Sequence, residues 1–283
     1  MIDAQPLLTI VVATLNSARR LGRCLESIAA QTYPHREVIV QDGGSTDGTL
    51  ELVRAHADTV THWESSQDRG IYDAWNKALG YVRGKWVCFL GADDYLWSPD
   101  SLASVARAAA ARRPGTRLLS GQVAVVNEQG EVLEVHGRPW HQQGRASMRW
   151  LPLPYPGLFH HRSLFAEVGG FDEGLRIAGD YDFLVRALEA AEVESIPEVL
   201  TGMEVGGISS ATANELEMLR EIALVWRARG LARRPTPWWW WTYGKAAVRV
   251  GMRRAAGERA ASQIFDAYRR LRGRPAFWTR RMM

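Results

Sequence analysis

The chain has 283 residues, of which 46% are hydrophobic and 23% charged, so it has enough apolar surface for a large core and does not resemble a disordered chain. Its two cysteines, Cys24 and Cys88, have neither metal-site nor disulfide-framework spacing, and we interpret them as small core residues. The net charge of +4 conceals an uneven distribution of charge along the chain. The sequence contains no run of 18 uninterrupted apolar residues, so no membrane span is predicted.

Strands and helices alternate in the first part of the chain. Leu7 to Thr14 is an apolar run after an acidic rather than basic N-terminus, which predicts a buried strand and not a signal peptide. Ala18 to Gln31 has apolar residues at helical spacing, Glu37 to Gln41 predicts a second strand, and Val60 to Glu64 is consistent with a third. This rhythm predicts an α/β fold with a mainly parallel sheet and helices on both faces.

The next helix and strand lead to the most informative residues. Ile71 to Val82 predicts an amphipathic helix, and Trp86 to Gly91 predicts a strand buried on both faces. The strand ends at Asp93 and Asp94, where open α/β sheets bind ligands. The acid pair could hold a divalent cation and, through it, a phosphate. A solvated turn into a helix started by Ser98 is the alternative.

The pattern changes after residue 115. Two extended segments between Arg117 and Val135 flank a turn at Asn127 to Gly130, which predicts a hairpin. Pro139 to Pro156 is rich in proline and tryptophan, and we expect it to be irregular. Asp180 to Leu188 predicts a helix with acids in its first turn, and Ile196 to Val205 looks extended.

Five motifs occur in order over residues 7 to 205. They are Thr14 to Asn16, Asp42 to Thr49, Asp68 to Lys77, Phe89 to Asp94, and Gly169 to Asp172 followed by Asp180 to Asp182. This ordered set resembles the family 2 glycosyltransferases. The resemblance implies a GT-A (Rossmann-like) fold, a nucleotide-diphosphate sugar donor, with UDP-sugar favoured, and inverting transfer. It also implies a lipid-linked or saccharide acceptor in bacterial cell-surface polysaccharide synthesis.

The resemblance also implies roles for individual residues. Asp180 matches the catalytic base, and Asp93 and Asp94 match the acidic motif that meets the ribose and a divalent metal, Mn or Mg. The residues expected to bind the nucleotide sugar are Thr14, Asn16, Asp42, Gly43, Ser45, Asp68, Gly70, Asp73, Asn76 and Asp93. The alternative for Asp68, Asp73 and Asn76 is that they are ordinary polar residues on the surface or cap a helix. We expect Asp182 to pair with Arg186.

Three glycines depart from the family pattern. Gly43 stands where many members have a second aspartate, and Gly91 stands where the motif Asp-x-Asp-Asp has its first. Gly179 precedes Asp180 where members often have glutamate. The sequence therefore leaves open which of Asp93 and Asp94 ligates the metal directly.

Two other functions remain to be weighed. A non-catalytic nucleotide-sugar-binding scaffold of a polysaccharide assembly complex would have no need of Asp180 together with the acid pair. A sugar-phosphate nucleotidyltransferase would need a glycine-rich basic loop after the first strand, but Thr14 to Arg20 contains no glycine. The adjacent His160 and His161 could line an acceptor site or be ordinary surface residues.

The C-terminal tail is basic and aromatic. From Arg220 onward there are 16 Lys and Arg against 3 Asp and Glu, a balance of +13, and because the chain totals +4 the remaining residues carry −9. Trp238 to Trp241, with Tyr243 and basic neighbours, suits peripheral contact with an anionic membrane. Helices packed on the catalytic domain are the alternative, and nucleic acid is not expected because no recognised module accompanies the charge.

These patterns predict a domain organisation and a location. We expect a glycosyltransferase domain over residues 1–219, with a nucleotide-sugar-binding half (1–115) and an acceptor-binding half (116–219). Residues 220–283 would form a basic helical extension. The expected location is cytoplasmic and peripheral on the inner face of the cell membrane.

Overall fold

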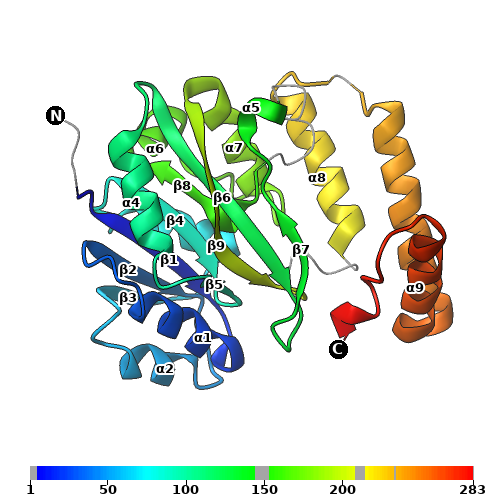
Figure 1. Ribbon diagram of the computed structural model, residues 1–283, viewed down its shortest axis with the longest axis horizontal. Coiled ribbons are helices and arrows are strands. Elements are labelled where there is room, and N and C mark those ends of the chain that lie inside the picture. Colours follow the sequence, from blue (N-terminus) through cyan, green and yellow to red (C-terminus); the bar gives the residue numbers. More distant parts are fainter. Residues whose placement is uncertain (1–4, 144–152, 208–213, 233, 283) are drawn as a thin grey trace. The chain divides into compact units, whose positions relative to one another are not determined.

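The computed structural model describes residues 5–143, 153–207, 214–232 and 234–282 (Figure 1). The chain divides into two compact units: residues 1–124 with 135–203 form the first, and residues 125–134 with 204–283 form the second. Every candidate site residue belongs to the first unit. The expected irregular segment Pro139 to Pro156 falls partly outside the described residues, at 144–152.

The parallel half of the sheet follows the predicted rhythm. Its strands are β1 (Leu8–Thr14), β2 (Arg36–Asp42), β3 (His62–Ser65) and β4 (Trp86–Gly91). They pair in parallel in the order β3-β2-β1-β4 and lie side by side in Figure 1. The connecting helices are α1 (Ala18–Ala29), α2 (Thr49–Ala55) and α3 (Ile71–Leu79). All four carboxyl ends therefore meet at one edge of the sheet, where the predicted site residues follow the strands.

Beyond β4 the sheet becomes antiparallel. Its remaining strands are β5 (Asp94–Leu96), β6 (Thr116–Val126), β7 (Val132–His136), β8 (Leu158–His161) and β9 (Glu192–Glu204). β8 pairs antiparallel with β4 and β6, β5 pairs antiparallel with β9, and β7 pairs with β6 as the predicted hairpin. Neither β5 nor β8 was predicted, because each is recognisable as a strand only by its pairing with segments far away in the chain. Asp94 therefore opens a strand rather than a turn into a helix.

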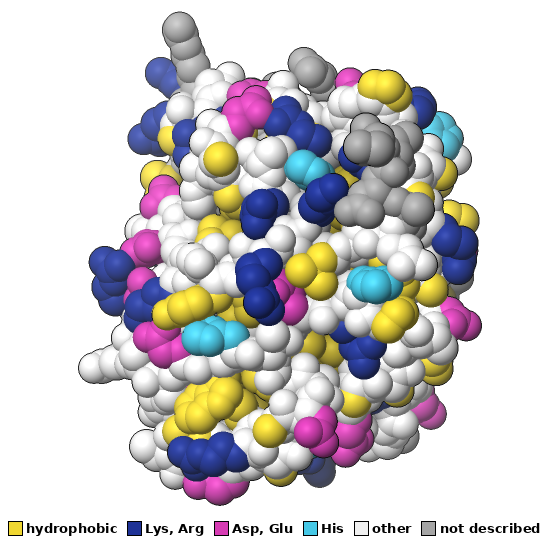
Figure 2. Space-filling model, turned by 90° about the vertical axis from the view of Figure 1, so that its left-hand side faces the viewer, with side chains coloured by type: hydrophobic (Ala, Val, Ile, Leu, Met, Phe, Trp, Pro, Cys, Tyr) yellow, Lys and Arg dark blue, Asp and Glu magenta, His cyan; other side chains and the backbone are white. Residues whose placement is uncertain are grey.

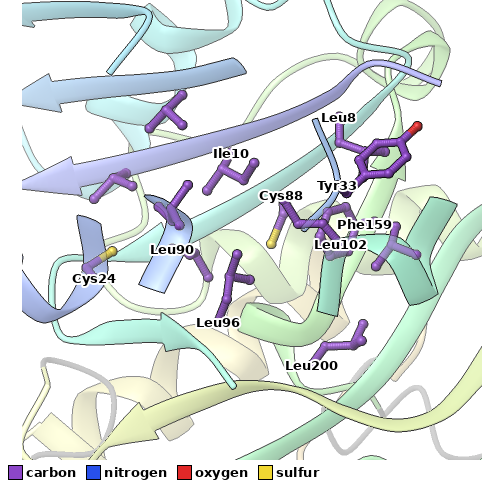
Figure 3. Close-up of a cluster of buried hydrophobic side chains, with 14 of the residues drawn as sticks. Leu8, Ile10, Cys24, Tyr33, Cys88, Leu90, Leu96, Leu102, Phe159 and Leu200 are labelled. Atoms are coloured by element: carbon purple, nitrogen blue, oxygen red, sulfur yellow. The ribbon is translucent and has the colours of Figure 1, made fainter. Parts of the chain in front are cut away.

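Helices cover both faces of the sheet. The helices that follow are α4 (Ser101–Ala111), α5 (Trp140–Gln143), α6 (Ser163–Val168) and α7 (Gly179–Ala190). On one face, Ile10 of β1 and Cys88 and Leu90 of β4 are buried with Leu102 of α4 (Figure 3). On the other face, Trp75 of α3 lies against Phe89 of β4, with ring centroids 5.0 Å apart. Both cysteines are free and buried, as the composition suggested.

Of the two histidines that the sequence placed near the acceptor or on the surface, His160 needs a correction. His160 has no exposed surface, and its ring lies 5.1 Å from that of Tyr155 and 5.4 Å from that of Phe183. Burial lowers the pKa of His160 to about 3, so it is neutral in the folded chain. His160 is a core residue of β8, and the interpretation as a surface or acceptor-site residue is wrong.

The second unit is built on two further helices, α8 (Glu215–Ala228) and α9 (Pro237–Leu271). α9 bends at Gly257, whose φ of 80° is not helical. The indole N–H of Trp239 donates to the carbonyl of Leu219 at 3.0 Å, and this tryptophan is 5% exposed. Its neighbours Trp240 and Trp241 are 59% and 66% exposed. Within the tryptophan cluster, Trp239 is thus packed against α8, whereas Trp240 and Trp241 are on the surface.

Asp266 folds the end of the chain back within the second unit. Its buried carboxylate accepts hydrogen bonds from the backbone N–H groups of Phe277, Trp278 and Thr279 at 2.8 to 2.9 Å. Burial acts to raise the pKa of Asp266, but these bonds together bring it below the usual value. The tail is therefore a packed structure, and within the described residues no helix has the length and apolar character needed to cross a membrane.

Glu37 is a buried acid at the end of the sheet away from the candidate site. It accepts hydrogen bonds from the Thr9 hydroxyl at 2.6 Å, the Arg83 N–H at 2.7 Å and the Gly84 N–H at 2.9 Å, and pairs with the Arg83 guanidinium at 2.8 Å. Burial acts to raise the pKa of Glu37, but the four bonds together lower it. The ionised carboxylate therefore fixes the start of β1 to the turn before β4.

We expect Glu37→Gln to lower the free energy of unfolding by about 1.5 to 3 kcal/mol at neutral pH, because an uncharged amide accepts these bonds more weakly. A folded-state pKa below the unfolded value gives stability that is present above the unfolded pKa and is lost as the pH falls through the folded pKa. The difference in urea denaturation between wild type and variant should therefore shrink towards acid pH. Glu26→Gln, at an exposed position on α1, is the control; equal losses in both variants would contradict this role.

Candidate active site

The loops after β1 and β2 are bonded to each other. The N–H of Asn16 donates to the Ser45 hydroxyl at 2.7 Å, and the Asn16 side-chain oxygen accepts from the Thr46 N–H at 2.9 Å. Asn16 has a φ of 47°, a left-handed conformation that asparagine tolerates better than most residues. The predicted residues Asn16 and Ser45 are therefore brought together, and they fix the shape of the two loops at this edge of the sheet.

Asp42 is the centre of the second loop. Its carboxylate has no exposed surface and accepts from the N–H groups of Gly44 and Ser45 at 3.0 and 2.9 Å. The hydroxyls of Ser45 and Ser65 donate to it at 2.5 and 2.6 Å. The sequence missed Ser65, which lies at the end of β3. Asp42 shapes the loop in this structure, and its contact with the nucleotide sugar stays a prediction.

Thr14 offers a polar atom at the same edge. Its carbonyl accepts the N–H of Gly43 at 2.9 Å, which joins the ends of β1 and β2. The side chain is 5% exposed, and among the residues that the structure describes none bonds to its hydroxyl. Because a buried hydroxyl usually has a partner, Thr14 is a candidate for a ligand contact.

Asp68 lies over the loop that follows β2. Its Oδ1 atom accepts the N–H of Gly70 at 3.0 Å. A Cβ atom added to Gly43 would lie 2.5 Å from Oδ2 of Asp68, so the carboxylate occupies the space above that glycine. Burial raises the pKa of Asp68, and the negative charges of Asp73 and Asp42 act in the same direction.

Asp73 and Asn76 hold the start of α3 in place. Asp73 is 7% exposed, accepts the N–H of Arg69 at 2.9 Å and pairs with Lys77 at 3.4 Å. The Asn76 amide donates to the Phe171 carbonyl at 3.0 Å and accepts the Phe171 N–H at 2.9 Å. These bonds fit the structural alternative that the sequence left open for both residues. Their contact with the donor stays a prediction.

The acid pair after β4 folds back over Gly91. Oδ2 of Asp94 accepts the Gly91 N–H at 2.9 Å, and a Cβ atom at Gly91 would lie 2.6 Å from Oδ1 of Asp93. Asp94 is 7% exposed, whereas Asp93 is more open to solvent. Burial raises the pKa of Asp94 well above its usual range, and the charge of Asp93 adds to this effect.

This donor set fits a cation shared with a substrate. Carboxylate oxygens suit Mg²⁺ or Mn²⁺, and Mg²⁺ is commonly held by one or two carboxylates together with substrate phosphates and water. Within the described ranges no three acidic, histidine or cysteine side chains form a complete cation site. Asp93 and Asp94 could thus supply one or two ligands to a diphosphate-bound cation. A cation would also relieve the repulsion between the two carboxylates.

Asp180 lies in the first turn of α7, and Oδ1 accepts the N–H of Tyr181 at 2.7 Å. The hydroxyl of Tyr72, on α3, is 3.2 Å from Oδ1 of Asp180 and 2.6 Å from the carbonyl of Ile177. Burial raises the pKa of Tyr72, and the charge of Asp180 raises it further, so Tyr72 is a neutral hydroxyl beside the carboxylate. The bond connects the α3 motif to the predicted base.

The part played by Tyr72 was not predicted from the sequence. A Cβ atom at Gly179 would lie 2.7 Å from the Tyr72 ring, so the glycine is needed for the ring to pack against the start of α7. The glycine at position 179, where family members often have glutamate, was the only signal in the sequence for this contact. The fold shows that this glycine accommodates the Tyr72 ring. The predicted pair of Asp182 and Arg186 is confirmed, with 3.0 Å between the carboxylate and the guanidinium.

Comparison with known proteins identifies the family. The model of Glycosyl transferase family 2 matches residues 9–166. A PGL/p-HBAD biosynthesis glycosyltransferase of Mycobacterium tuberculosis is 30% identical over 232 residues, which cover 78% of this chain and 86% of that protein. The succinoglycan biosynthesis protein ExoO of Rhizobium meliloti is 33% identical over 208 residues, covering 66% of this chain and 57% of that protein.

Solved structures agree on the fold. A mannosyltransferase from Pyrobaculum calidifontis, in complex with GDP-Man and Mn²⁺, superposes with a TM-score of 0.64 at 23% identity and covers 99% of this chain and 84% of its own. TarS of S. aureus in complex with UDP-GlcNAc gives 0.63 at 23% identity and covers 78% of this chain and 66% of its own. The predicted GT-A-like α/β architecture is confirmed, and the chain belongs to the family 2 glycosyltransferases.

Proposed function

We propose that the protein transfers a sugar from a nucleotide diphosphate to an acceptor hydroxyl with inversion at the anomeric carbon, with Asp180 as the base. The observation that carries the proposal is the hydrogen bond between Tyr72 and Asp180, 3.2 Å long. Tyr72 belongs to α3, whose preceding loop contains Asp68 and Gly70. The predicted base is therefore linked to the element that begins at the predicted donor site.

The residues suit a direct displacement. An aspartate is ionised at neutral pH when its pKa is near the reference value of about 3.9, and a carboxylate can take the proton of an attacking hydroxyl. Holding that hydroxyl and the donor in line supplies much of the rate enhancement. Asp93, with Asp94, would hold a divalent cation on the diphosphate, and the bound cation would stabilise the charge that develops on the leaving group.

The proposed donor and acceptor classes are supported by the ligands and the names of similar proteins. TarS was solved with UDP-GlcNAc and the Pyrobaculum mannosyltransferase with GDP-Man and Mn²⁺, so both nucleotides deserve testing although UDP is the favoured one. Relatives are named for PGL/p-HBAD and succinoglycan biosynthesis. These names support a lipid-linked or saccharide acceptor and a role in bacterial surface glycoconjugate synthesis.

A thermal-shift screen tests the donor proposal. UDP-GlcNAc, UDP-glucose and GDP-mannose are each added with Mn²⁺, with Mg²⁺ or with EDTA. We expect one donor to raise the melting temperature, and to do so more with metal, because a ligand that binds only the folded state stabilises it. Turnover of that donor would exclude the non-catalytic scaffold, and formation of a sugar phosphate with a nucleoside triphosphate would instead indicate a nucleotidyltransferase. No shift with any nucleotide sugar would contradict the proposal.

We also propose that the second unit holds the enzyme against the inner face of an anionic membrane. Trp241, Lys245 and Val248 recur at helical spacing on α9, and Trp241 and Val248 are 66% and 58% exposed. Lys245 lies 5.7 Å from the Trp241 ring. By contrast, basic and acidic side chains are intermingled on the face shown in Figure 2. An aromatic group flanked by cations suits a lipid headgroup region.

We expect the full chain to sediment with liposomes that contain anionic lipid, and a Trp240→Ala/Trp241→Ala variant to bind about 100-fold more weakly or worse, because it loses two aromatic side chains that contribute on the order of 1.5 to 3 kcal/mol each when buried. High salt should weaken binding without abolishing it, since salt screens only the attraction of Lys and Arg side chains to the anionic lipid. Trp63→Ala, which removes a 39% exposed tryptophan from β3, is the matched control. Equal binding by all three proteins would contradict membrane contact through α9.

A further inference from the structure

The turn that follows α6 is fastened to the middle of α3. The Asn76 side chain bonds both backbone groups of Phe171, and its nitrogen also donates to Oε1 of Glu173 at 2.8 Å. A Cβ atom at Gly170 would lie 2.5 Å from Oδ1 of Asn76, so the backbone passes directly beside the amide. Glu173 is thus held by a helix that lies almost 100 residues earlier in the chain.

The other carboxylate oxygen of Glu173 forms an ion pair with Arg69. Arg69 lies between Asp68 and Gly70, in the loop of residues 66–70 before α3, which we call the donor loop, and its guanidinium also pairs with Asp73 at 3.3 Å. The side chains of Arg69 and Glu173 are 74% and 30% exposed. An exposed ion pair adds little to the free energy of unfolding, so this contact is not needed to keep the chain folded.

The same helix also holds the start of α7. Tyr72 and Asn76 are four residues apart and therefore lie on one face of α3. Tyr72 bonds Asp180, whereas Asn76 and Arg69 bond Glu173, seven positions earlier. The segment that leads to the proposed base is therefore fixed at both ends, and its first fixed point is attached to the donor loop.

We propose that Glu173 is a positioning residue for sugar transfer, which fixes the proposed base relative to the donor loop through its bonds to Arg69 and Asn76. The inference rests on the proposed function, since it takes Asp180 as the base. Glu173 acts through the start of α7 and not by contact with the reacting atoms. A small displacement of a base from the attacking hydroxyl lowers the rate steeply, whereas it leaves the affinity for the donor nearly unchanged.

Glu173→Ala removes both contacts, and we expect kcat to fall about 10-fold while the Kd of the donor stays within about 2-fold of wild type. Transfer from the donor found in the thermal-shift screen is followed as release of its nucleoside diphosphate, and Kd is measured by calorimetry. Glu167→Gln, which breaks an ion pair with Arg117 in α6, is the matched control and should keep the wild-type kcat. A lower melting temperature with kcat unchanged in Glu173→Ala would indicate a structural role alone and would overturn the inference.

A double-variant cycle tests whether Glu173 acts together with Arg69. Glu173→Gln keeps an oxygen for the Asn76 amide but breaks the ion pair, and Arg69→Gln breaks the same pair from the other side. We expect each to lower kcat about 3-fold and the double variant to lower it no further, because all three lack the same contact.

Two results would overturn the inference: losses that multiply in the double variant, or the wild-type kcat in both single variants. The proposed function would stand in either case if Asp180→Asn remained impaired. Wild-type turnover by Asp180→Asn would overturn the inference and the proposed function together.

Discussion

Replacing Asp180 by asparagine should reduce sugar transfer by at least about 100-fold, because the amide keeps the size of the side chain but cannot accept a proton from the acceptor hydroxyl. The loss should appear in kcat, with the dissociation constant of the donor little changed. The measurement is transfer from the donor found in the thermal-shift screen, together with donor binding by calorimetry. The α7 helix should remain folded, since asparagine can still accept the Tyr181 N–H.

The matched control is Glu189→Gln, which removes an exposed carboxylate from the far end of the same helix and should leave transfer unchanged. Tyr72→Phe extends the test, because it keeps the ring beside Gly179 but removes the hydroxyl that lies 3.2 Å from Asp180. Loss of donor affinity with kcat intact in Asp180→Asn would assign Asp180 to the nucleotide site instead of the chemical step.

The second large effect concerns the acid pair. Changing both Asp93 and Asp94 to asparagine should abolish metal-dependent donor binding and reduce transfer by on the order of 100-fold or more, because neutral amides are poor ligands for a hard cation. In wild type, the affinity for the donor should increase with Mn²⁺ concentration, whereas in the double variant it should not change. Circular dichroism and the melting temperature report whether the fold survives.

Single substitutions separate the two carboxylates. Asp94 already accepts the Gly91 N–H and is nearly inaccessible, whereas Asp93 is more open to solvent. We therefore expect Asp93→Asn to reproduce most of the loss of metal dependence and Asp94→Asn to affect it less. A well-folded double variant with the wild-type dependence on Mn²⁺ would exclude both residues as ligands.

The parallel half of the fold could be predicted from the sequence because its signals are local. The central strand Trp86 to Gly91 is one uncharged run, and the helix with Trp75 has a strong apolar face, so periodicity identifies both. β8 could not be predicted, since its four residues are recognisable as a strand only by their pairing with β4 and β6. His160 was misread for the same reason, because burial depends on neighbours far away in the chain.

The candidate site was predictable as a set of motifs but not as a set of contacts. Motif order identified Asp180, but nothing local indicates that Tyr72 is hydrogen-bonded to it across more than 100 residues. The glycine at position 43 looked like a missing acid, and its reason appears only when Asp68 is seen above it. A contact between two loops leaves no spacing for a sequence pattern to detect.

The configuration of the sugar released in the absence of acceptor tests the central claim most directly. The α-linked donor that the enzyme prefers is incubated with wild type, and proton NMR follows the free sugar before mutarotation equilibrates its anomers. A single displacement, with water in place of the acceptor and Asp180 as base, predicts that the β-anomer appears first and that Asp180→Asn forms it far more slowly. Initial release of the α-anomer, or equal rates in the two proteins, would contradict inverting transfer through Asp180.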